Sequence, residues 1–243
     1  MTLRRRADLL LVERGLFSSR AKAQAAIAAG GVTANAGIVH APSEQIPVDA
    51  DLSARPAHPW VSRGGVKLAA ALDHFRIDPK GRVCLDIGAS TGGFTDVLLA
   101  RGARRVYAVD VGRDQLDPRL RKRPEVVAFE ETDIRALEPE RLVEAPDLIV
   151  IDVSFISLKL VLPAATGHAA AAAEIVMLIK PQFEVGRRGT KKGIVRDPAL
   201  QARACEEISA LVRSLAWNLL GVLPSPVLGR EGNREFLLGA RRG

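Results

Sequence analysis

The chain has 243 residues, 47% hydrophobic and 26% charged, so it has enough apolar material for a packed core and is not a disordered or fibrous protein. Lysine and arginine exceed aspartate and glutamate by 35 − 28 = 7 charges, which makes a polyanion the first partner to consider. Cys84 and Cys205 lie far apart without metal-ligand spacing, and they predict a reduced, cytoplasmic protein with no metal site. The apolar windows are too short to span a bilayer and no targeting segment is visible, so we expect no membrane partner.

The basic excess lies at the two ends of the chain. Residues 1–40 carry 6 basic and 2 acidic side chains, a net charge of +4, and residues 180–243 carry 12 and 6, a net charge of +6. Residues 59–179 carry 16 basic and 17 acidic side chains, a net charge of −1. Each end could be an ordinary solvated surface, and the two together could bind one polyanion.

Residues 1–58 predict a small α+β domain that ends in a linker. Apolar residues recur with helical spacing over 7–14 and 19–29, Ser18-Ser19 offers N-caps for the second helix, and Gly30-Gly31 ends it. Strand-prone segments then follow at residues 32–35, 38–39 and 46–54, with a turn at Ala36-Gly37 and a proline-containing linker over residues 55–59. A unit of this size is predicted to be an accessory domain.

From residue 59 onward, apolar strands alternate with helical patterns. We expect strands at residues 83–87, 105–109, 126–129, 148–152, 174–179, 219–223 and 235–238, and helices at 66–75, 93–101 and 198–215. This alternation predicts an α/β domain over residues 59–243, with a doubly wound, mostly parallel sheet covered by helices on both faces. Ligands of such sheets bind outside the carboxyl ends of the strands.

A glycine-rich turn follows the first of these strands and opens a helix. Gly88 and Gly93 match the outer glycines of the dinucleotide-binding pattern, but Ser90 occupies the position of the middle glycine that admits a pyrophosphate. A ligand without phosphate, such as S-adenosylmethionine, is therefore favoured over NAD. The alternative is a tight turn without a ligand.

Acidic residues follow the next two strands. Asp110 lies 22 residues after Gly88, at about the offset from which a carboxylate can hydrogen-bond ribose hydroxyls. Asp133 follows the third strand and could accept the adenine amino group. Either residue could instead cap a helix or a turn.

Four charged residues lie at element boundaries. Asp152 and Lys180 close apolar strands, Glu235 opens the last strand, and Lys67 opens the helix after the linker. Charges in such places are costly unless they are paired. The four could form a structural ion-pair cluster, or a site that lowers a lysine pKa and positions a hydroxyl.

Several motifs resemble those of the hemolysin A (TlyA) family of rRNA 2′-O-methyltransferases. They are VSRGGVKL at 61–68, LDIGASTGGFTD at 85–96, DVSFISL at 152–158, KPQFE at 180–184 and GNREF at 232–236. In order, they span nearly the whole chain. The resemblance implies a Rossmann-like methyltransferase domain of the FtsJ type that uses S-adenosylmethionine.

The resemblance also implies roles for particular residues. The Lys-Asp-Lys-Glu tetrad of FtsJ-like ribose methyltransferases would fall on Lys67, Asp152, Lys180 and Glu235. The methyl-donor site would comprise Asp86, Gly88, Ala89, Ser90, Gly92, Gly93, Phe94, Asp110 and Asp133.

The N-terminal region resembles the small RNA-binding fold named after ribosomal protein S-four. Residues at its expected positions are Arg6, Asp8, Gly15, Ser19, Arg20, Ala23, Gly31 and Val32, whereas its usual Asn-Gly turn is here Asn35-Ala36-Gly37. The RNA contacts that the resemblance and the basic charge suggest are Arg6, Arg14, Ser19, Arg20, Lys22, Gln24 and Arg63. Contacts of this kind position RNA rather than read its sequence.

The leading hypothesis is methyl transfer from S-adenosylmethionine to a ribose 2′-hydroxyl of rRNA. The absence of terminal extensions resembles the shorter members of the family, which implies a cytidine of the large ribosomal subunit. Lys180 would be the general base, Asp152 would orient it, and Lys67 with Glu235 would place the ribose. The alternatives are a catalytically silent rRNA-binding factor and a membrane-lytic protein; we interpret lytic activity as indirect.

Overall fold

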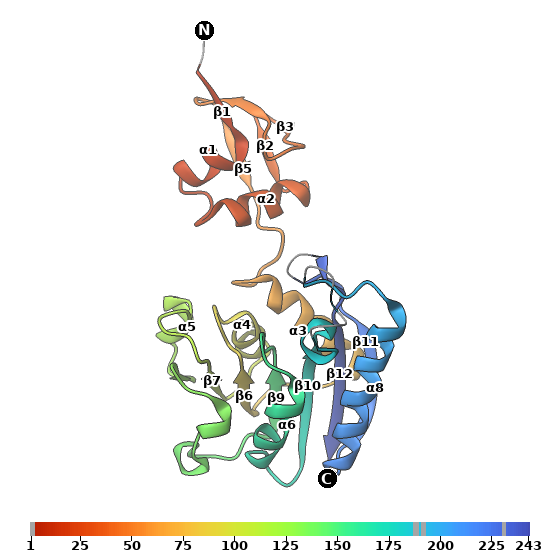
Figure 1. The fold of residues 1–243 in the computed structure, drawn as a ribbon. Helices are drawn as coiled ribbons and strands as arrows, with labels where there is room; N and C mark the ends of the chain where they lie inside the picture. Colours follow the sequence, from red (N-terminus) through yellow and green to blue (C-terminus); the bar gives the residue numbers. More distant parts are fainter. Residues whose placement is uncertain (1–2, 187–189, 191–192, 230–231) are drawn as a thin grey trace. The chain divides into compact units, whose positions relative to one another are not determined.

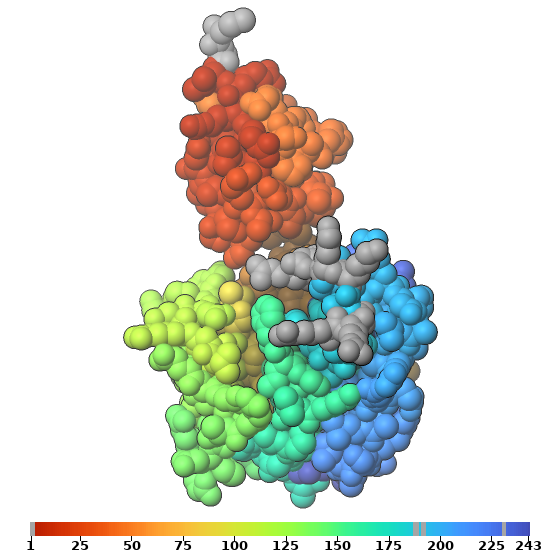
Figure 2. All heavy atoms as spheres, viewed as in Figure 1, coloured from red at the N-terminus to blue at the C-terminus, as the bar shows by residue number. Residues whose placement is uncertain are grey.

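The computed structural model describes residues 3–186, 190, 193–229 and 232–243. It divides into two compact units, Met1–Pro59 and Trp60–Gly243 (Figures 1 and 2). Within the described residues, no helix combines the length and the apolar character that crossing a bilayer requires.

The N-terminal unit packs two short helices against two small sheets (Figure 1). The helices are α1 (Ala7–Glu13) and α2 (Arg20–Ala28), and the strands are β1 (Arg4–Arg6), β2 (Val32–Ala34), β3 (Gly37–Ile38), β4 (Gln45–Pro47) and β5 (Leu52–Ala54). β1 pairs antiparallel with β4, and the other three strands lie in the order β3-β2-β5. Leu11, Ala23 and Val32 are fully buried at the centre of its core.

The hairpin in this unit turns one residue earlier than the sequence predicted. Thr33 pairs with Ile38 and Ala34 with Gly37, so the turn is Asn35-Ala36 rather than Ala36-Gly37. Asn35 and Ala36 have φ angles of 48° and 63°, as a two-residue turn between twisted strands requires. Ala36 therefore occupies a conformation that costs an L-residue with a Cβ about 1–2 kcal/mol. The short strand β1 was also not predicted.

Asp8, at the start of α1, is a fully buried carboxylate surrounded by donors. It accepts hydrogen bonds from Arg6 at 3.0 and 3.1 Å, from Arg20 at 2.9 Å and from Gln24 at 2.8 Å. The Arg6 guanidinium is the largest of the influences that hold the pKa of Asp8 well below its usual range. One buried anion thus fixes the positions of three donors that reach toward the surface of the unit.

This lowered pKa predicts an acid-sensitive N-terminal unit. Because the pKa of Asp8 is lower in the folded state, its stabilising contribution is present above the unfolded-state pKa of about 4 and is lost as pH falls through the folded value. At pH 7, Asp8→Asn is therefore expected to speed hydrogen exchange at α1 amides, and the difference from wild type should shrink below about pH 4. Asp49→Asn, at an exposed position of the same unit, is the matched control. If the exchange rates of Asp8→Asn and wild type differed by the same factor at every pH, this role for the Asp8 charge would be contradicted.

The second unit confirms the predicted α/β fold with a doubly wound, mostly parallel sheet. Its seven strands lie in the order β11-β12-β10-β9-β6-β7-β8. The strands are β6 (Val83–Ile87), β7 (Arg105–Val109), β8 (Val126–Phe129), β9 (Leu148–Ile151), β10 (Ala173–Ile179), β11 (Asn218–Pro224) and β12 (Phe236–Arg242). Neighbouring strands from β8 to β10 are parallel, whereas β12 runs antiparallel to both β10 and β11.

Helices cover both faces of this sheet (Figure 1). α3 (Arg63–Phe75) and α4 (Gly93–Ala100) pack on one face, and α6 (Leu158–Gly167) and α8 (Pro198–Ser214) pack on the other. Alternation along β6 explains the two cores, because Leu85 faces α6 and α8 whereas Cys84 faces α3 and α4. The other elements that the structure describes in this unit are short: α5 (Pro118–Arg121), α7 (Pro181–Glu184) and the 3₁₀ turns η1 (Ile134–Ala136) and η2 (Pro139–Arg141).

Two boundaries near the predicted site differ from expectation. α3 begins at Arg63, three residues before the predicted start, because the Ser62 side chain accepts a hydrogen bond from the Gly64 amide and caps the helix. Lys67 consequently lies inside α3 rather than at its start. β12 begins at Phe236, so Glu235 immediately precedes the last strand instead of opening it. Helix α6 was not predicted.

Candidate active site

A cavity of about 310 Å³ lies at the carboxyl ends of the parallel strands. Its walls come from the start of α3, the turn between β6 and α4, and the segments that follow β9 and β10. Nine of the predicted site residues line it: Arg63, Lys67, Gly88, Ala89, Ser90, Gly93, Phe94, Asp152 and Lys180. The cavity lies where the doubly wound topology places ligands and within the size range of small-molecule sites, about 300–1,000 Å³.

The glycine turn between β6 and α4 forms one wall of this cavity and requires its glycines. Gly88 has a φ angle of +81°, and a Cβ at this position would lie 2.6 Å from the carbonyl oxygen of Asp152. Gly92 also has a positive φ, and a Cβ on Gly93 would overlap the Ser62 hydroxyl. The turn therefore presents bare backbone to the cavity and packs tightly against the end of β9.

Asp110, just after β7, holds this turn in place. Its two carboxylate oxygens accept hydrogen bonds from the amides of Ser90 at 2.8 Å and Gly112 at 2.7 Å. The Ser90 hydroxyl in turn hydrogen-bonds Gln115 at 3.0 Å. Each carboxylate oxygen has a second lone pair, so these contacts are compatible with the predicted ribose contact of Asp110, which stays a prediction.

Asp133 has a different environment from the other predicted donor-site residues. It caps the 3₁₀ turn η1 by accepting a hydrogen bond from the Arg135 amide, and it forms an ion pair with the Arg135 side chain at 2.6 Å. That guanidinium lowers the pKa of Asp133. Asp133 is not among the residues that line the cavity, and the capping role anticipated as the alternative is the one that the structure displays.

Asp86 lies beneath the glycine turn rather than in the cavity wall. It is fully buried in β6, and the Thr95 hydroxyl donates a hydrogen bond to it at 2.6 Å. Burial raises the pKa of Asp86 to about 7. This contact ties β6 to the first turn of α4 and thereby supports the turn between them.

The four residues of the predicted tetrad form two ion pairs. Lys180 Nζ lies 2.6 Å from Asp152 Oδ1, and Lys67 Nζ lies 2.5 Å from Glu235 Oε2. Both lysines and Glu235 are buried, and Asp152 is partly buried. The cavity is therefore lined by two lysine amines, each paired with a carboxylate at 2.5 or 2.6 Å.

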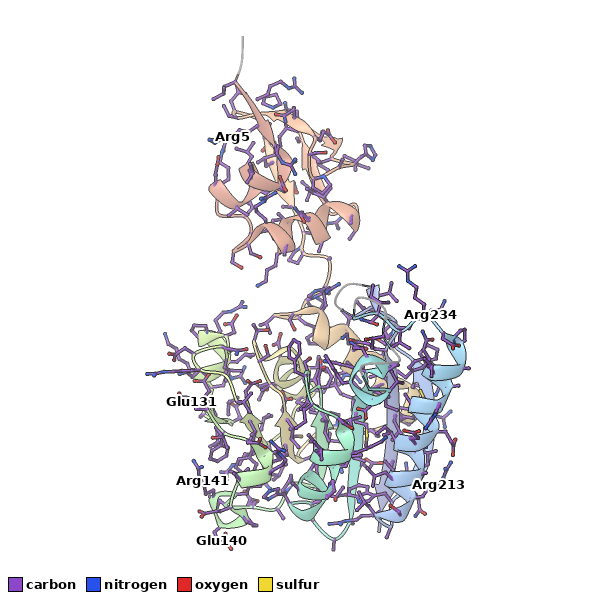
Figure 3. The ribbon with its side chains drawn as sticks, viewed as in Figure 1. Arg5, Glu131, Glu140, Arg141, Arg213 and Arg234 are labelled. Carbon is purple, nitrogen blue, oxygen red and sulfur yellow. The ribbon has the colours of Figure 1, made fainter. Side chains whose placement is uncertain are left out.

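Register explains how Glu235 reaches this edge from an antiparallel strand. Phe236 pairs with Ile179 at the carboxyl end of β10. Glu235 directly precedes Phe236 and Lys180 directly follows Ile179, so the antiparallel pairing brings both residues to the same edge of the sheet. Exposure alternates before β12: Asn233 and Glu235 are buried, whereas Arg234 is exposed and extends away from the ribbon (Figure 3).

Two residues beside Asp152 were not predicted as site residues. The Ser154 hydroxyl lies 2.7 Å from Lys180 Nζ and lines the cavity. Phe155 is 85% exposed with a φ angle of +65°, and its ring centroid lies 5.3 Å from that of Phe183. A large exposed aromatic residue in a left-handed conformation is unusual. The available sequence signal was an aromatic residue three positions after a strand-end aspartate.

Comparison with known proteins agrees with this geometry. Residues 60–242 match the model of the FtsJ-like methyltransferase family. The chain is 46% identical to the 16S/23S rRNA (cytidine-2′-O)-methyltransferase TlyA of Mycobacterium tuberculosis, over 99% of this chain and 91% of that protein. The chain belongs to the TlyA family of FtsJ-like methyltransferases. It is also 38% identical to hemolysin A of Brachyspira hyodysenteriae, over 96% of this chain and 98% of that protein. A solved hemolysin-like structure from Streptococcus thermophilus has a TM-score of 0.77 and 38% identity, covering 100% of this chain and 90% of that one.

TlyA-family membership implies S-adenosylmethionine as the methyl donor, and the cavity fits such a group. The turn at Gly88 leaves no room for a Cβ and offers backbone to a ligand. Asp110 anchors the same turn with lone pairs to spare, and Ser90 replaces the glycine that a pyrophosphate would need. The residues that would hold the donor are therefore Gly88, Ala89, Ser90 and Phe94 from the cavity wall, with Asp110 beside them.

The predicted RNA contacts of this TlyA-family protein lie mostly in the N-terminal unit. Arg6, Arg20 and Gln24 are fixed by Asp8, as described above. Arg14 donates to the carbonyl oxygen of Val48, Ser19 caps α2, and Lys22 is exposed. Arg63 is exposed and lines the cavity of the second unit. Their part in RNA binding stays a prediction.

Proposed function

We propose that this protein transfers a methyl group from S-adenosylmethionine to the ribose 2′-hydroxyl of an rRNA nucleotide, a cytidine of the large ribosomal subunit. The observation that carries the proposal is the placement of Lys180. Its Nζ, held by Asp152, lies in the wall of the same cavity as the glycine turn. A base and a donor-binding turn thus share one small cavity.

The donor supplies a methyl group already activated by its sulfonium. What the protein must add is alignment of the hydroxyl and removal of its proton. Lys180, in its neutral form, takes that proton at Nζ, and Asp152 orients the amine and balances the ammonium that forms. Lys67 lines the cavity and is held by the buried Glu235, and it provides a second side against which the ribose is placed.

RNA binding is assigned to the N-terminal unit together with the rim of the cavity. Asp8 holds Arg6, Arg20 and Gln24 in fixed positions, which reduces the side-chain entropy that these donors lose when they bind phosphate. The exposed ring of Phe155 offers a surface on which an RNA base can stack next to the reacting ribose.

The deciding experiment is transfer of a tritiated methyl group from S-adenosylmethionine to ribosomal subunits from a strain that lacks this gene. Large subunits are expected to be labelled, and the mark to appear as a primer-extension stop at one cytidine. Small subunits are assayed in parallel, because the name of the M. tuberculosis relative covers both rRNAs. Binding of both substrates without transfer would favour the silent rRNA-binding factor instead.

The exposed lysine of the N-terminal unit, Lys22, is expected to act through phosphate contacts. Affinity for subunits should fall steeply with salt, and Lys22→Ala should reduce the slope of log affinity against log salt by about 1. Lys80→Ala is the matched control, because Lys80 is an exposed lysine just before β6, at the opposite end of the strands from the cavity. Filter binding at several salt concentrations measures both slopes. Equal slopes for the two variants would remove Lys22 from the interface.

Phe155 is expected to contribute stacking energy. Phe155→Ala should weaken the productive rRNA complex by about 1–3 kcal/mol, the range found for one stacked base, and raise KM for subunits about tenfold. Phe155→Trp keeps an aromatic face and should retain most of the affinity. The free energy of unfolding should change little, because the ring is exposed. An unchanged KM for Phe155→Ala would mean that no base stacks there.

A further inference from the structure

The Ser154 hydroxyl is a second polar contact of the Lys180 amine, besides Asp152. Lys180 Nζ is 2.6 Å from Asp152 Oδ1 and 2.7 Å from Ser154 Oγ. All three residues line the cavity. The Lys180 side chain is only 9% exposed, so its amine has little freedom to turn toward bulk water.

A neutral lysine amine has two N–H groups and one lone pair, arranged tetrahedrally with the Cε bond. The Ser154 hydroxyl accepts one N–H of the amine at 2.7 Å, whereas Asp152 Oδ1 lies 2.6 Å from the nitrogen as an ion-pair partner without an aligned hydrogen bond. The directional contact to Ser154 fixes one N–H and so limits rotation about the Cε–Nζ bond. The second N–H and the lone pair share the two other positions, and the Asp152 carboxylate favours the arrangement in which the N–H, not the lone pair, faces it.

We propose that Ser154 is a positioning residue that, together with Asp152, directs the Lys180 lone pair at the substrate hydroxyl. This inference rests on the proposed methyl transfer and names a residue that the tetrad does not contain. As the hydroxyl proton moves to Nζ, the amine becomes an ammonium, and its hydrogen bond to the Ser154 hydroxyl becomes charge-assisted and stronger. The contribution of Ser154 is therefore larger in the transition state than in the bound ground state, so it should affect kcat rather than KM.

The experiment is single-turnover methylation of large subunits by the full chain, with donor affinity measured by calorimetry. Ser154→Ala should slow the chemical step about tenfold or more, as expected for loss of one hydrogen bond to a group that becomes charged. KM for subunits and donor affinity should stay unchanged. Ser154→Thr keeps the hydroxyl at an exposed position and should restore most of the rate.

Ser157→Ala is the matched control, because it removes a hydroxyl from the same segment outside the cavity wall. The Ser157 hydroxyl bonds Glu184 at 2.5 Å and caps α6, so this variant should lower the thermal midpoint while the rate stays near wild type. An equal loss of rate in both alanine variants would assign the effect to loosening of the segment and would overturn the proposal. A wild-type rate in Ser154→Ala would overturn the role of Ser154 and leave the proposed methyl transfer untouched. An inactive wild-type protein would overturn both.

Discussion

Lys180→Ala is expected to abolish methyl transfer, with a fall in the single-turnover rate of about 10²-fold or more, the usual contribution of a positioned general base. The reason is geometric. Lys180 is the cavity residue whose amine is held by the carboxylate of Asp152 and the hydroxyl of Ser154. Donor affinity and rRNA affinity should both stay near wild type, because the glycine turn and the N-terminal unit are unaltered.

The Lys180→Arg variant tests whether Lys180 acts by accepting a proton or only through its positive charge. A guanidinium keeps the positive charge beside Asp152 but does not deprotonate in a protein, so it should not restore turnover. Single-turnover methylation, with calorimetric donor binding measured in parallel, tests both variants. Substantial activity of Lys180→Arg would show that the residue acts through its charge alone, and the general-base role would then be abandoned.

The strand-end residues of this site were predictable from sequence because topology places them. In a parallel sheet, the residues that follow β9 and β10 must lie at the same edge, so Asp152 and Lys180 are brought close by the fold itself. Parallel topology alone does not predict the position of Glu235. This residue reaches the edge because β12 runs antiparallel to β10 in a register that pairs Phe236 with Ile179. Neither the direction nor the register of a strand is given by its apolar pattern alone.

Other features could not be predicted because one residue type serves several roles. An aspartate after a strand can bind a ligand or cap a turn, and local contacts decide between them: Asp110 anchors the glycine turn, whereas Asp133 pairs with Arg135. Ser154 and Phe155 had no periodic signal, because they lie in the irregular segment between β9 and α6. The turn at Asn35-Ala36 was missed because alanine is rarely found with a positive φ.

The Lys67–Glu235 pair is expected to show the largest effect on stability. Lys67 and Glu235 have side chains only 10% and 3% exposed, and their charged atoms are 2.5 Å apart. Glu235→Ala leaves the Lys67 ammonium buried without its partner, which should lower the free energy of unfolding by about 3–5 kcal/mol. Urea unfolding followed by tryptophan fluorescence measures this change in the second unit, since the two tryptophans, Trp60 and Trp217, both lie in it.

A double replacement by apolar residues distinguishes the structural role of this pair from its catalytic one. Lys67→Met with Glu235→Leu removes both charges and fills similar volume, a change that is often neutral or stabilising by about 1–4 kcal/mol in other buried pairs. The double variant should therefore regain most of the stability lost in Glu235→Ala, and it should bind the methyl donor. It should remain nearly inactive on large subunits, because this pair no longer supplies an ammonium or a carboxylate to place the ribose. Recovery of activity along with stability would show that the pair only holds α3 against the start of β12, and that the catalytic work at this edge of the sheet is done by Lys180 and Asp152.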